Sequence, residues 1–422
     1  MTRFRRITNC TIVTPTGTAA QHGAAMGHLT TITDAEIHIA DERIAYAGSA
    51  EAAPQAPEEG VTMLPDIDAR GCVVLPGFVD SHTHLVFGGL RADEFKMRLN
   101  GASYMEIMNA GGGIQSTVNA TRGADHSDLY DKALYHLKQM SAMGITTVEA
   151  KSGYGLSLDT ERKLLEIISE LRSSSVPMTV VATMMAAHAV PAEYNGDTEA
   201  YVDHIIADML PQLRSLADIC DVFTERGVFE IEASRRLMSA AKALGYKLKF
   251  HADEITTLGG AELAVELGAL SADHLLHVGD KGVKALAASD TVATLLPLTA
   301  FALKEPYAPA RRLIDAGAAV ALATDFNPGS CYSYSIPLLI ALACIYMNMT
   351  IEEVITALTL NGAAALGLAA DTGSIEVGKY ADLAILNTSN INDLPYFIGI
   401  NQVGTTVYHG SAVGVDHTPT LP

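Results

Sequence analysis

Short apolar runs alternate with amphipathic segments through the middle of the chain, a rhythm typical of repeated strand–helix units. The apolar runs predict eight strands, at residues 72–75, 145–150, 178–186, 219–224, 246–250, 270–272, 291–296 and 319–323. Eight such units within about 300 residues match the size of a (β/α)8 barrel. A doubly wound sheet is the alternative, but no glycine-rich phosphate-binding fingerprint follows the first strand.

The segments between the strands carry helix signals. Thr350 followed by Glu353 predicts a capping box, and Ser127 and Ser234 are expected at the N-caps of two other helices. Gly245 stands where the helix that begins near Ser234 should end. These signals support helices between the strands and therefore the barrel.

Both ends of the chain instead alternate apolar and polar residues with the period of two that strands show. Residues 37–39 and 44–46 predict a hairpin, and residues 374–377, 381–386 and 404–408 predict short strands. Neither end has enough strands to bury a face alone. We therefore expect an α/β protein, a (β/α)8 TIM barrel with a small composite β-sandwich domain formed by both ends. The expected N-terminal, barrel and C-terminal segments are residues 1–70, 71–368 and 369–422.

Composition narrows the class of protein. Apolar residues make up 49% and charged residues 18% of the 422 positions, which excludes a disordered chain. The net charge of −20 argues against nucleic acid and an anionic membrane as partners, because both are polyanions. Five scattered cysteines without a CxxC pair, and the lack of an apolar run long enough for a signal peptide or membrane span, predict a cytoplasmic protein.

Ionisable residues follow the predicted strands. In a barrel of this kind the active site lies just after the C-terminal ends of the strands. Seven of the eight predicted strands end in such a residue. In chain order these are His82 and His84, Lys151, His188, Glu225, His251, Asp273 with His274, and Asp325. The pattern predicts an active site at one mouth of the barrel.

Histidine spacing suggests a metal site. His82 and His84 form a His-x-His pair, whose imidazoles lie about 6.6 Å apart on one face of an extended strand. By itself the pair fits two solvated or core histidines equally well. His251 shares a strand face with Lys247 and Lys249, so all three are expected to point into the barrel. The expected ligands, which suit Zn(II) or Fe(II), are His82, His84, His251 and Asp325.

Several segments resemble the amidohydrolase superfamily. Pro76 to His84 is similar to its PGFVDxHxH signature, and Gly373 to Leu383 resembles its C-terminal β-domain motif, so the resemblance spans nearly the whole chain. Within the superfamily, three segments resemble the enzymes that open the ring of 4-imidazolone-5-propanoate in L-histidine degradation. These segments are Val148 to Leu156, His251 to Glu254, and Ala323 to Ser330. The resemblance implies a hydrolase that breaks a ring amide C–N bond and forms N-formimidoyl-L-glutamate.

The resemblance also implies one divalent metal ion per subunit. Two-metal relatives use a carboxylated lysine at the end of the fourth strand. Here Lys151 ends the second predicted strand and Glu225 ends the fourth, so a single ion is expected. A different strand count would leave either residue available to support a second ion.

Catalytic roles follow from the same resemblance. Glu254 stands three residues after His251 and is expected to act as the general base that later returns the proton to the ring nitrogen. The alternative is a glutamate that stabilises a helix N-terminus. His274 is expected to hydrogen-bond the catalytic water or the developing oxyanion, with Asp325 accepting from the same water. The alternative for His274 is a paired histidine inside the barrel.

Substrate contacts are implied for residues in the loops that follow the strands. Arg91 is expected to bind the propionate carboxylate through two hydrogen bonds, and Tyr154 to add a hydroxyl group. His188 is expected to polarise or orient the ring carbonyl. The remaining contacts, to the ring and the formimino end, are expected from Asn327, Gly329 and Ser330.

Two other functions fit parts of the pattern. A purine or pyrimidine deaminase uses the same arrangement of histidines, glutamate and aspartate, and it would release ammonia, which ring opening does not. A catalytically silent scaffold would be expected to have lost some of these residues. The long apolar helical segments also make a homodimer the expected assembly.

Overall fold

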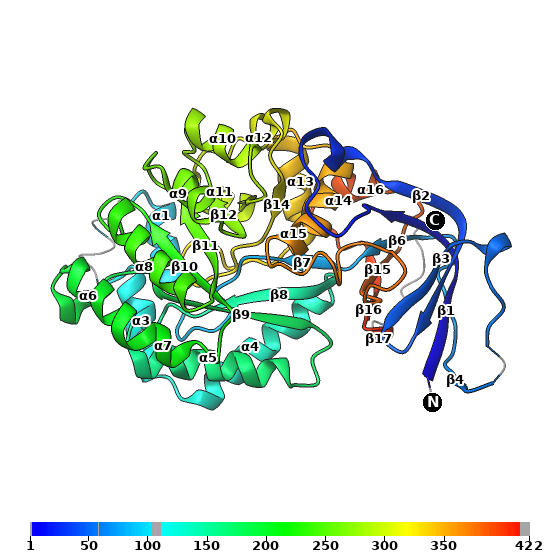
Figure 1. Ribbon diagram of the computed structural model, residues 1–422, viewed down its shortest axis with the longest axis horizontal. Helices are drawn as coiled ribbons and strands as arrows, with labels where there is room; N and C mark the ends of the chain where they lie inside the picture. The colour runs from blue at the N-terminus through cyan, green and yellow to red at the C-terminus, as the bar shows by residue number, and fades with distance from the viewer. Residues whose placement is uncertain (1, 58, 103–105, 107–110, 414–422) are drawn as a thin grey trace.

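The computed structural model describes residues 2–57, 59–102, 106 and 111–413, and its strands form two sheets (Figure 1). Residues 414–422 of the expected C-terminal segment lie outside the described residues. The eight-stranded sheet forms the barrel on the left of the view, and the nine-stranded sheet lies on the right. Among the described residues, no helix combines the length and the apolar character needed to cross a bilayer.

The barrel strands follow one another in chain order, each parallel to its neighbour. They are β7 (Phe78–Asp80), β8 (Ile145–Lys151), β9 (Thr179–Ala187), β10 (Ile219–Thr224), β11 (Lys247–Ala252), β12 (Ser271–His274), β13 (Val292–Leu295) and β14 (Val320–Leu322). Seven of them lie at or within two residues of the predicted strands. Parallel strands buried on both faces need near-continuous apolar runs, and that requirement made them visible in the sequence.

Helices lie around the barrel and at its mouth (Figure 1). They are α1 (Ala92–Leu99), α3 (Ile114–Gly123), α4 (His126–Ser141), α5 (Leu158–Arg172), α6 (Thr198–His204), α7 (Leu210–Leu213), α8 (Ile231–Ala243), α9 (Gly260–Leu267), α10 (Asp280–Ala287), α11 (Pro297–Leu303), α12 (Ala310–Ala316), α13 (Ile336–Tyr346), α14 (Ile351–Leu358) and α15 (Leu360–Ala364). In α5 an apolar stripe that includes Leu164, Ile168 and Leu171 is fully buried against the strands.

The first and last barrel strands are joined just beyond their ends. The backbone N–H of Asp325 donates to the carbonyl of His82 at 3.0 Å, and the N–H of His84 donates to the carbonyl of Phe326 at 2.9 Å. The Asp80 carboxylate adds a hydrogen bond from the backbone N–H of the residue before Asp325, at 2.9 Å. These bonds close the cylinder, and the (β/α)8 prediction is confirmed.

The predicted first strand was wrong. Residues 72–75 overlap β6 (Val73–Pro76), which pairs with β1 and β15 of the other sheet, and the first barrel strand is β7. Both segments are buried and apolar, so hydrophobicity alone cannot separate them. Gly77 lies between them, where any Cβ would collide with the Thr146 side chain, so the chain can change sheets there. The division at residues 70/71 and 368/369 stays a prediction.

Strands from both ends of the chain make up the second sheet. They are β1 (Thr2–Thr14), β2 (Thr30–Ala40), β3 (Arg43–Ser49), β4 (Val61–Met63), β5 (Ile67–Asp68), β6, β15 (Leu383–Leu386), β16 (Val403–Tyr408) and β17 (Ser411–Val413). One apolar cluster joins Ile12 and Ile37 to Leu383 and Val407, so the composite origin is confirmed. The short helix α16 (Asp393–Tyr396) lies between β15 and β16.

The terminal hairpin and most local signals hold, with three exceptions. Ile39 pairs with Ile44 in the predicted hairpin, and the capping box of α14 makes both of its hydrogen bonds. Residues 374–377 form no strand. Ser127 and Ser234 lie inside α4 and α8, whose N-caps are Asp125 and Glu230. The Ser234 hydroxyl instead donates to the carbonyl of Phe229 at 3.0 Å, a partner that only the folded turn provides.

Candidate active site

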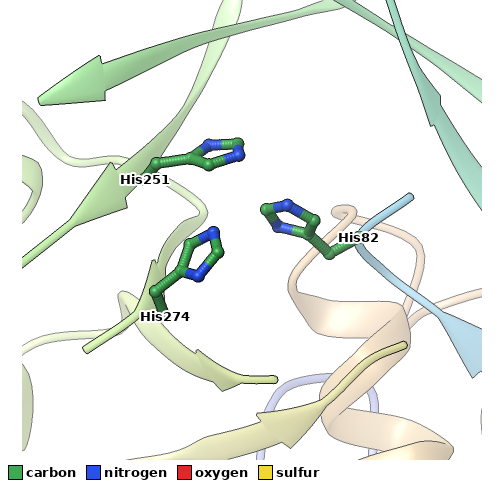
Figure 2. A group of neighbouring side chains, drawn as sticks. All are labelled: His82, His251 and His274. Atoms are coloured by element: carbon green, nitrogen blue, oxygen red, sulfur yellow. The ribbon is translucent and has the colours of Figure 1, made fainter. Parts of the chain in front are cut away.

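Three buried imidazoles meet at the mouth of the barrel (Figure 2). His82 follows β7, His251 lies in β11 and His274 ends β12, and the three rings point toward one another. The ring of His82 lies 4.5 Å from that of His251 and 5.2 Å from that of His274, measured between centroids. Residues nearly 200 positions apart in sequence therefore share one small space.

The four predicted ligands face a shared point in two overlapping groups, one of His82, His84 and Asp325 and the other of His82 and His251 with His274. Oδ1 of Asp325 lies 3.6 Å from Nε2 of His82 and 3.7 Å from Nε2 of His84. Nε2 of His251 lies 3.4 Å from Nε2 of His84. Ligand atoms bound to one tetrahedral ion at about 2.0–2.1 Å lie about 3.4 Å from one another. These three distances fit three edges of a metal coordination shell.

Hydrogen bonding to other residues leaves Nε2 of His82 and Oδ1 of Asp325 available at this point. Nδ1 of His82 is 2.7 Å from the Asp273 carboxylate, while Nε2 is buried and has no hydrogen-bond partner among the described residues. Oδ2 of Asp325 accepts from the Thr299 hydroxyl at 2.6 Å, which leaves Oδ1 for the shared point. Buried polar atoms without partners are costly, so this arrangement fits a bound cation.

His274 is a further possible ligand that sequence reasoning did not consider. Ligand atoms of His82, His251 and His274 all lie within 4.8 Å of one another, as do those of His82, His84 and Asp325. Both ring nitrogens of His274 are buried without a hydrogen-bond partner in the described part of the chain. His274 thus faces either the ion itself or a molecule bound to the ion.

Each of two ligand histidines has a carboxylate behind it. Asp273 contacts Nδ1 of His82, and Oδ2 of Asp221 lies 3.1 Å from Nδ1 of His251. A carboxylate at Nδ1 holds the proton there and directs the lone pair of Nε2 toward the metal. The sequence did not reveal Asp221, since it lies within β10 rather than at a strand end.

Two buried lysines complete this inner layer. Nζ of Lys151 lies 2.6 Å from Asp221 and 2.8 Å from Glu149. Nζ of Lys249 lies 3.1 Å from the Asp273 carboxylate and donates to the Ser271 hydroxyl at 2.8 Å. Lys249 therefore points inward as expected and has its partners.

Lys247 differs from the expectation. It is the first residue of β11 and is exposed, because the strand begins at the far end of the barrel from the active site.

The charge of Asp221 is set by its neighbours. At Asp221, burial alone would raise the pKa. The nearby charges of Lys151 and His251 nevertheless hold that pKa well below its usual range, so the residue is a carboxylate.

Glu254 stands beside the convergent histidines. Its Oε1 lies 3.5 Å from Nδ1 of His274. Burial raises the pKa of Glu254 to about 8, and the negative charge of Asp325 adds to the effect. A carboxyl group with such a pKa can take up and release a proton near neutral pH, as a general base must.

His188 is stacked on His84, with ring centroids 4.8 Å apart. Its Nδ1 lies 3.1 Å from the carbonyl of Gly153, and a carbonyl only accepts, so Nδ1 carries the proton. Burial lowers the pKa of His188 to about 3, which keeps the ring neutral. Its Nε2 is consequently a hydrogen-bond acceptor. The ring centroid of Tyr154 lies 5.1 Å from that of His188, and Tyr154 is also buried.

Arg91 lies at the edge of the site. Its Nε and Nη2 both face Glu94 Oε2 at 2.8 Å. A Cβ on Gly329 would collide with Nη1, so glycine at this position leaves room for the guanidinium. Arg98 also donates to the carbonyl of Gly329 at 3.1 Å. Neither Glu94 nor Arg98 was expected, since nothing in their spacing marks them.

Asn327 and Ser330 shape the loop after β14. Oδ1 of Asn327 accepts from the backbone N–H groups of Gly329 and Ser330, each at 2.8 Å. Its Nδ2 donates to the carbonyl of Asp325 at 2.7 Å. These bonds fold the loop back over Asp325, the predicted ligand.

The sequence did not indicate Thr299, because it follows β13, whose end carries no ionisable residue.

Glu225 stands apart from the metal ligands. Its carboxylate faces the backbone of residues 255 and 256 rather than the shared point. Lys151 is likewise turned into the inner layer. The fold therefore brings to one mouth the predicted ligands, Glu254, Arg91, Tyr154, His188 and Asn327. Glu225 and Lys151, the two candidates for a second metal site, face away from these ligands.

Comparisons with known proteins show the family of the chain. A family model described as "Amidohydrolase family" matches residues 73–413. Proteins named imidazolonepropionase from Phocaeicola vulgatus and Bacteroides thetaiotaomicron are 55% and 56% identical, each over 96% of this chain and 97% of their own.

A crystal structure of 5-methylcytosine deaminase from Klebsiella pneumoniae has the same fold, with a TM-score of 0.71. It is 18% identical, and the match covers 97% of each chain. The chain therefore belongs to the amidohydrolase family and, within it, to the imidazolonepropionases.

Proposed function

We propose that the chain hydrolyses the ring amide C–N bond of 4-imidazolone-5-propanoate and releases N-formimidoyl-L-glutamate, a step of L-histidine degradation. The observation that carries the proposal is the meeting of three imidazoles with the carboxyl groups of Asp325 and Glu254 at one mouth of the barrel. The identity to imidazolonepropionases over nearly the whole chain supports the choice of substrate.

One divalent ion per chain, Zn(II) or Fe(II), fits the donor set. Its proposed ligands are His82, His84, His251 and Asp325. When bound, the ion lowers the pKa of a coordinated water toward about 7 and so supplies a nucleophile at neutral pH. The pairing of Lys151 with two carboxylates supports a single ion, because their charges raise the pKa of the amine and keep it protonated, and an ammonium group has no lone pair to carboxylate.

Glu254 moves the proton in this proposal. The water oxygen forms a bond to the ring carbonyl carbon, and Glu254 accepts the proton that the water loses. The C–N bond then breaks, and Glu254 returns the proton to the leaving ring nitrogen. His274, beside Glu254 at 3.5 Å, hydrogen-bonds the oxyanion as negative charge develops on it.

Arg91 and Tyr154 bind the propionate arm. Two nitrogens of Arg91 face Glu94, so the carboxylate approaches the Nη1 side, next to Gly329. Tyr154 is buried and its pKa is raised, first by burial and then by the charge of Asp325, so its hydroxyl keeps its proton and donates. A cation and a neutral donor together suit a carboxylate.

His188 orients the ring rather than polarising its carbonyl. Its Nε2 is an acceptor, because Nδ1 carries the proton, and an acceptor binds a ring N–H and not a carbonyl oxygen. The loop of Asn327, Gly329 and Ser330 forms the wall at the ring and formimino end.

Partner and location follow from the surface and the charge. Helix α13 is almost wholly apolar, yet Ile345 and Tyr346 at its end are 52% and 60% exposed, and Phe301 of the adjacent α11 is 52% exposed. This patch supports a homodimer that covers it. The charge of −20 supports an enzyme of a small molecule that binds neither nucleic acid nor a membrane surface. The five free cysteines support a cytoplasmic location.

Ring opening and deamination predict different products from the purified protein. We expect ultraviolet absorbance of 4-imidazolone-5-propanoate to disappear without release of ammonia, and cytosine or guanine to be left unchanged. One ammonia per turnover from a purine or pyrimidine would establish the deaminase instead. The deaminase structure supports that alternative through its fold alone, at 18% identity.

Asp325→Ala should lose the metal and the activity together. Removing Oδ1 takes away the carboxylate that faces both His82 and His84, so metal affinity should fall about 100-fold or more. Metal per chain, measured by elemental analysis after dialysis, checks this result. Asp315→Ala, which removes an exposed carboxylate of α12, is the control and should keep the ion. Full metal content in Asp325→Ala would remove Asp325 from the ligand set.

Glu254→Gln should keep the metal and lose turnover. The amide cannot accept the water proton, so kcat should fall about 10²- to 10⁴-fold. The activity of the unaltered enzyme should rise with pH as the carboxyl loses its proton, and this acidic limb should vanish in the variant. Glu266→Gln, on the exposed face of α9, is the matched control. Near-normal kcat in Glu254→Gln would show that another group moves the proton.

Arg91→Ala should weaken substrate binding more than it slows turnover. Loss of a charge-assisted contact to the propionate should raise KM about 10- to 100-fold. The measurement compares KM for the natural substrate with KM for an imidazolone whose side chain lacks the carboxylate. An equal increase for both compounds contradicts the role given to Arg91.

A further inference from the structure

Glu225, the residue after β10, uses its carboxylate to hold the backbone that follows Glu254. Oε2 accepts from the backbone N–H of Ile255 at 2.9 Å and of Thr256 at 3.1 Å. Oε1 accepts from the N–H of Arg226 at 2.8 Å and from the Thr256 hydroxyl. Glu225 is 1% exposed, so these are buried, charge-assisted hydrogen bonds of the stronger kind.

This arrangement rules out the role in a second metal site that the sequence left open. A carboxylate has about four lone-pair positions. Four donors, three backbone N–H groups and one hydroxyl, already face the two oxygens of Glu225. A cation at Glu225 would have to displace some of these four donors.

The residue before Glu254 is held in a similar way. Asp253 is fully buried, and its Oδ1 accepts from the backbone N–H groups of Leu258 and Gly259, each at 2.9 Å. Its carbonyl accepts from the N–H of His277 at 2.9 Å. Glu254 therefore stands between two segments of backbone that buried carboxylates fix.

Other forces contribute little to the position of this turn. Residues 255 and 256 belong to no helix or strand, and the Ile255 side chain is 60% exposed, so apolar packing does not hold them. The Glu254 carboxylate has an ion-pair contact of 3.5 Å, to His274. Glu254 consequently depends on its backbone for its direction.

We propose that Glu225 is a positioning residue for Glu254. By binding the two N–H groups that follow Glu254, it fixes the backbone from which the base projects and so points the carboxyl group toward His274. This inference rests on the proposed role of Glu254 as the base. A displacement of about 1 Å of a catalytic group can cost about 100-fold in rate, so the effect is measurable.

Glu225→Ala should lower kcat about 100-fold while metal content and KM stay within about 2-fold of the unaltered enzyme. Glu225→Gln keeps an oxygen for the two N–H groups, and it should restore kcat to within about 10-fold. Glu232→Ala removes an exposed carboxylate of α8 and is the matched control. Normal kcat in Glu225→Ala, or loss of metal with kcat, overturns the proposal.

A second variant covers a failure to fold. Glu225→Asp keeps the charge but withdraws the carboxylate by one methylene group, which breaks the contacts with residues 255 and 256. We expect a loss of kcat in the same direction, with one ion retained per chain. Full activity in Glu225→Asp also overturns the proposal.

A double-mutant cycle separates this inference from the proposed function. In a Glu254→Gln background, Glu225→Asp should cost no further rate, because a positioning residue has nothing left to position. A full additional loss means that Glu225 acts by another route. If Glu254→Gln alone retains its rate, the proposed base is wrong. If Glu254→Gln is inactive while Glu225→Asp is normal, the positioning inference alone fails.

Discussion

Closure of the barrel is the constraint on which the site depends. The two backbone hydrogen bonds that join the ends of β7 and β14 involve the residues that supply ligand atoms. Asp325 donates its N–H to the carbonyl of His82, and His84 donates its N–H to Phe326. Three of the four proposed ligands are therefore positioned by the bonds that complete the fold. A chain that fails to close cannot bring these three residues together, so the proposed metal site depends on the completed fold.

The buried charges beneath the ligands suit a divalent cation. Two lysines face three carboxylates, which leaves one negative charge, and Asp325 adds a second. Burying so many ions without a counter-charge would be costly, because desolvation exceeds the gain from imperfect pairing. A dication at the shared point would offset this negative charge. The inner layer consists of Glu149, Lys151, Asp221, Lys249 and Asp273, all fully buried.

The sequence predicted features that depend on burial along a single strand, such as the barrel strands. It did not predict residues whose roles depend on contacts between strands. Apolar runs marked the strands, and His251 was found because it ends a run with clear alternation. Residues 72–75 were misassigned because an apolar run fits either sheet. The roles of Asp221 and Thr299 could not be predicted, because both residues act through contacts with residues from other strands. A single sequence gives spacing along the chain and no distances between strands.

Backbone strain at the strand ends connects the fold to the chemistry. Asp253, His274 and Asp325 all adopt left-handed backbone conformations, with φ of 49°, 76° and 52°. Each such residue costs about 1–3 kcal/mol and persists only where its surroundings hold it, although aspartate and histidine tolerate this region better than most residues. At two of the three residues, the hydrogen bonds that Asp253 accepts from residues 258 and 259 and that Asp325 accepts from Thr299 help to offset this cost. The chain thus turns sharply where the side chains of these three residues must face the mouth of the barrel. Aspartate and histidine tolerate this backbone conformation, and they are also residue types that bind metals and protons.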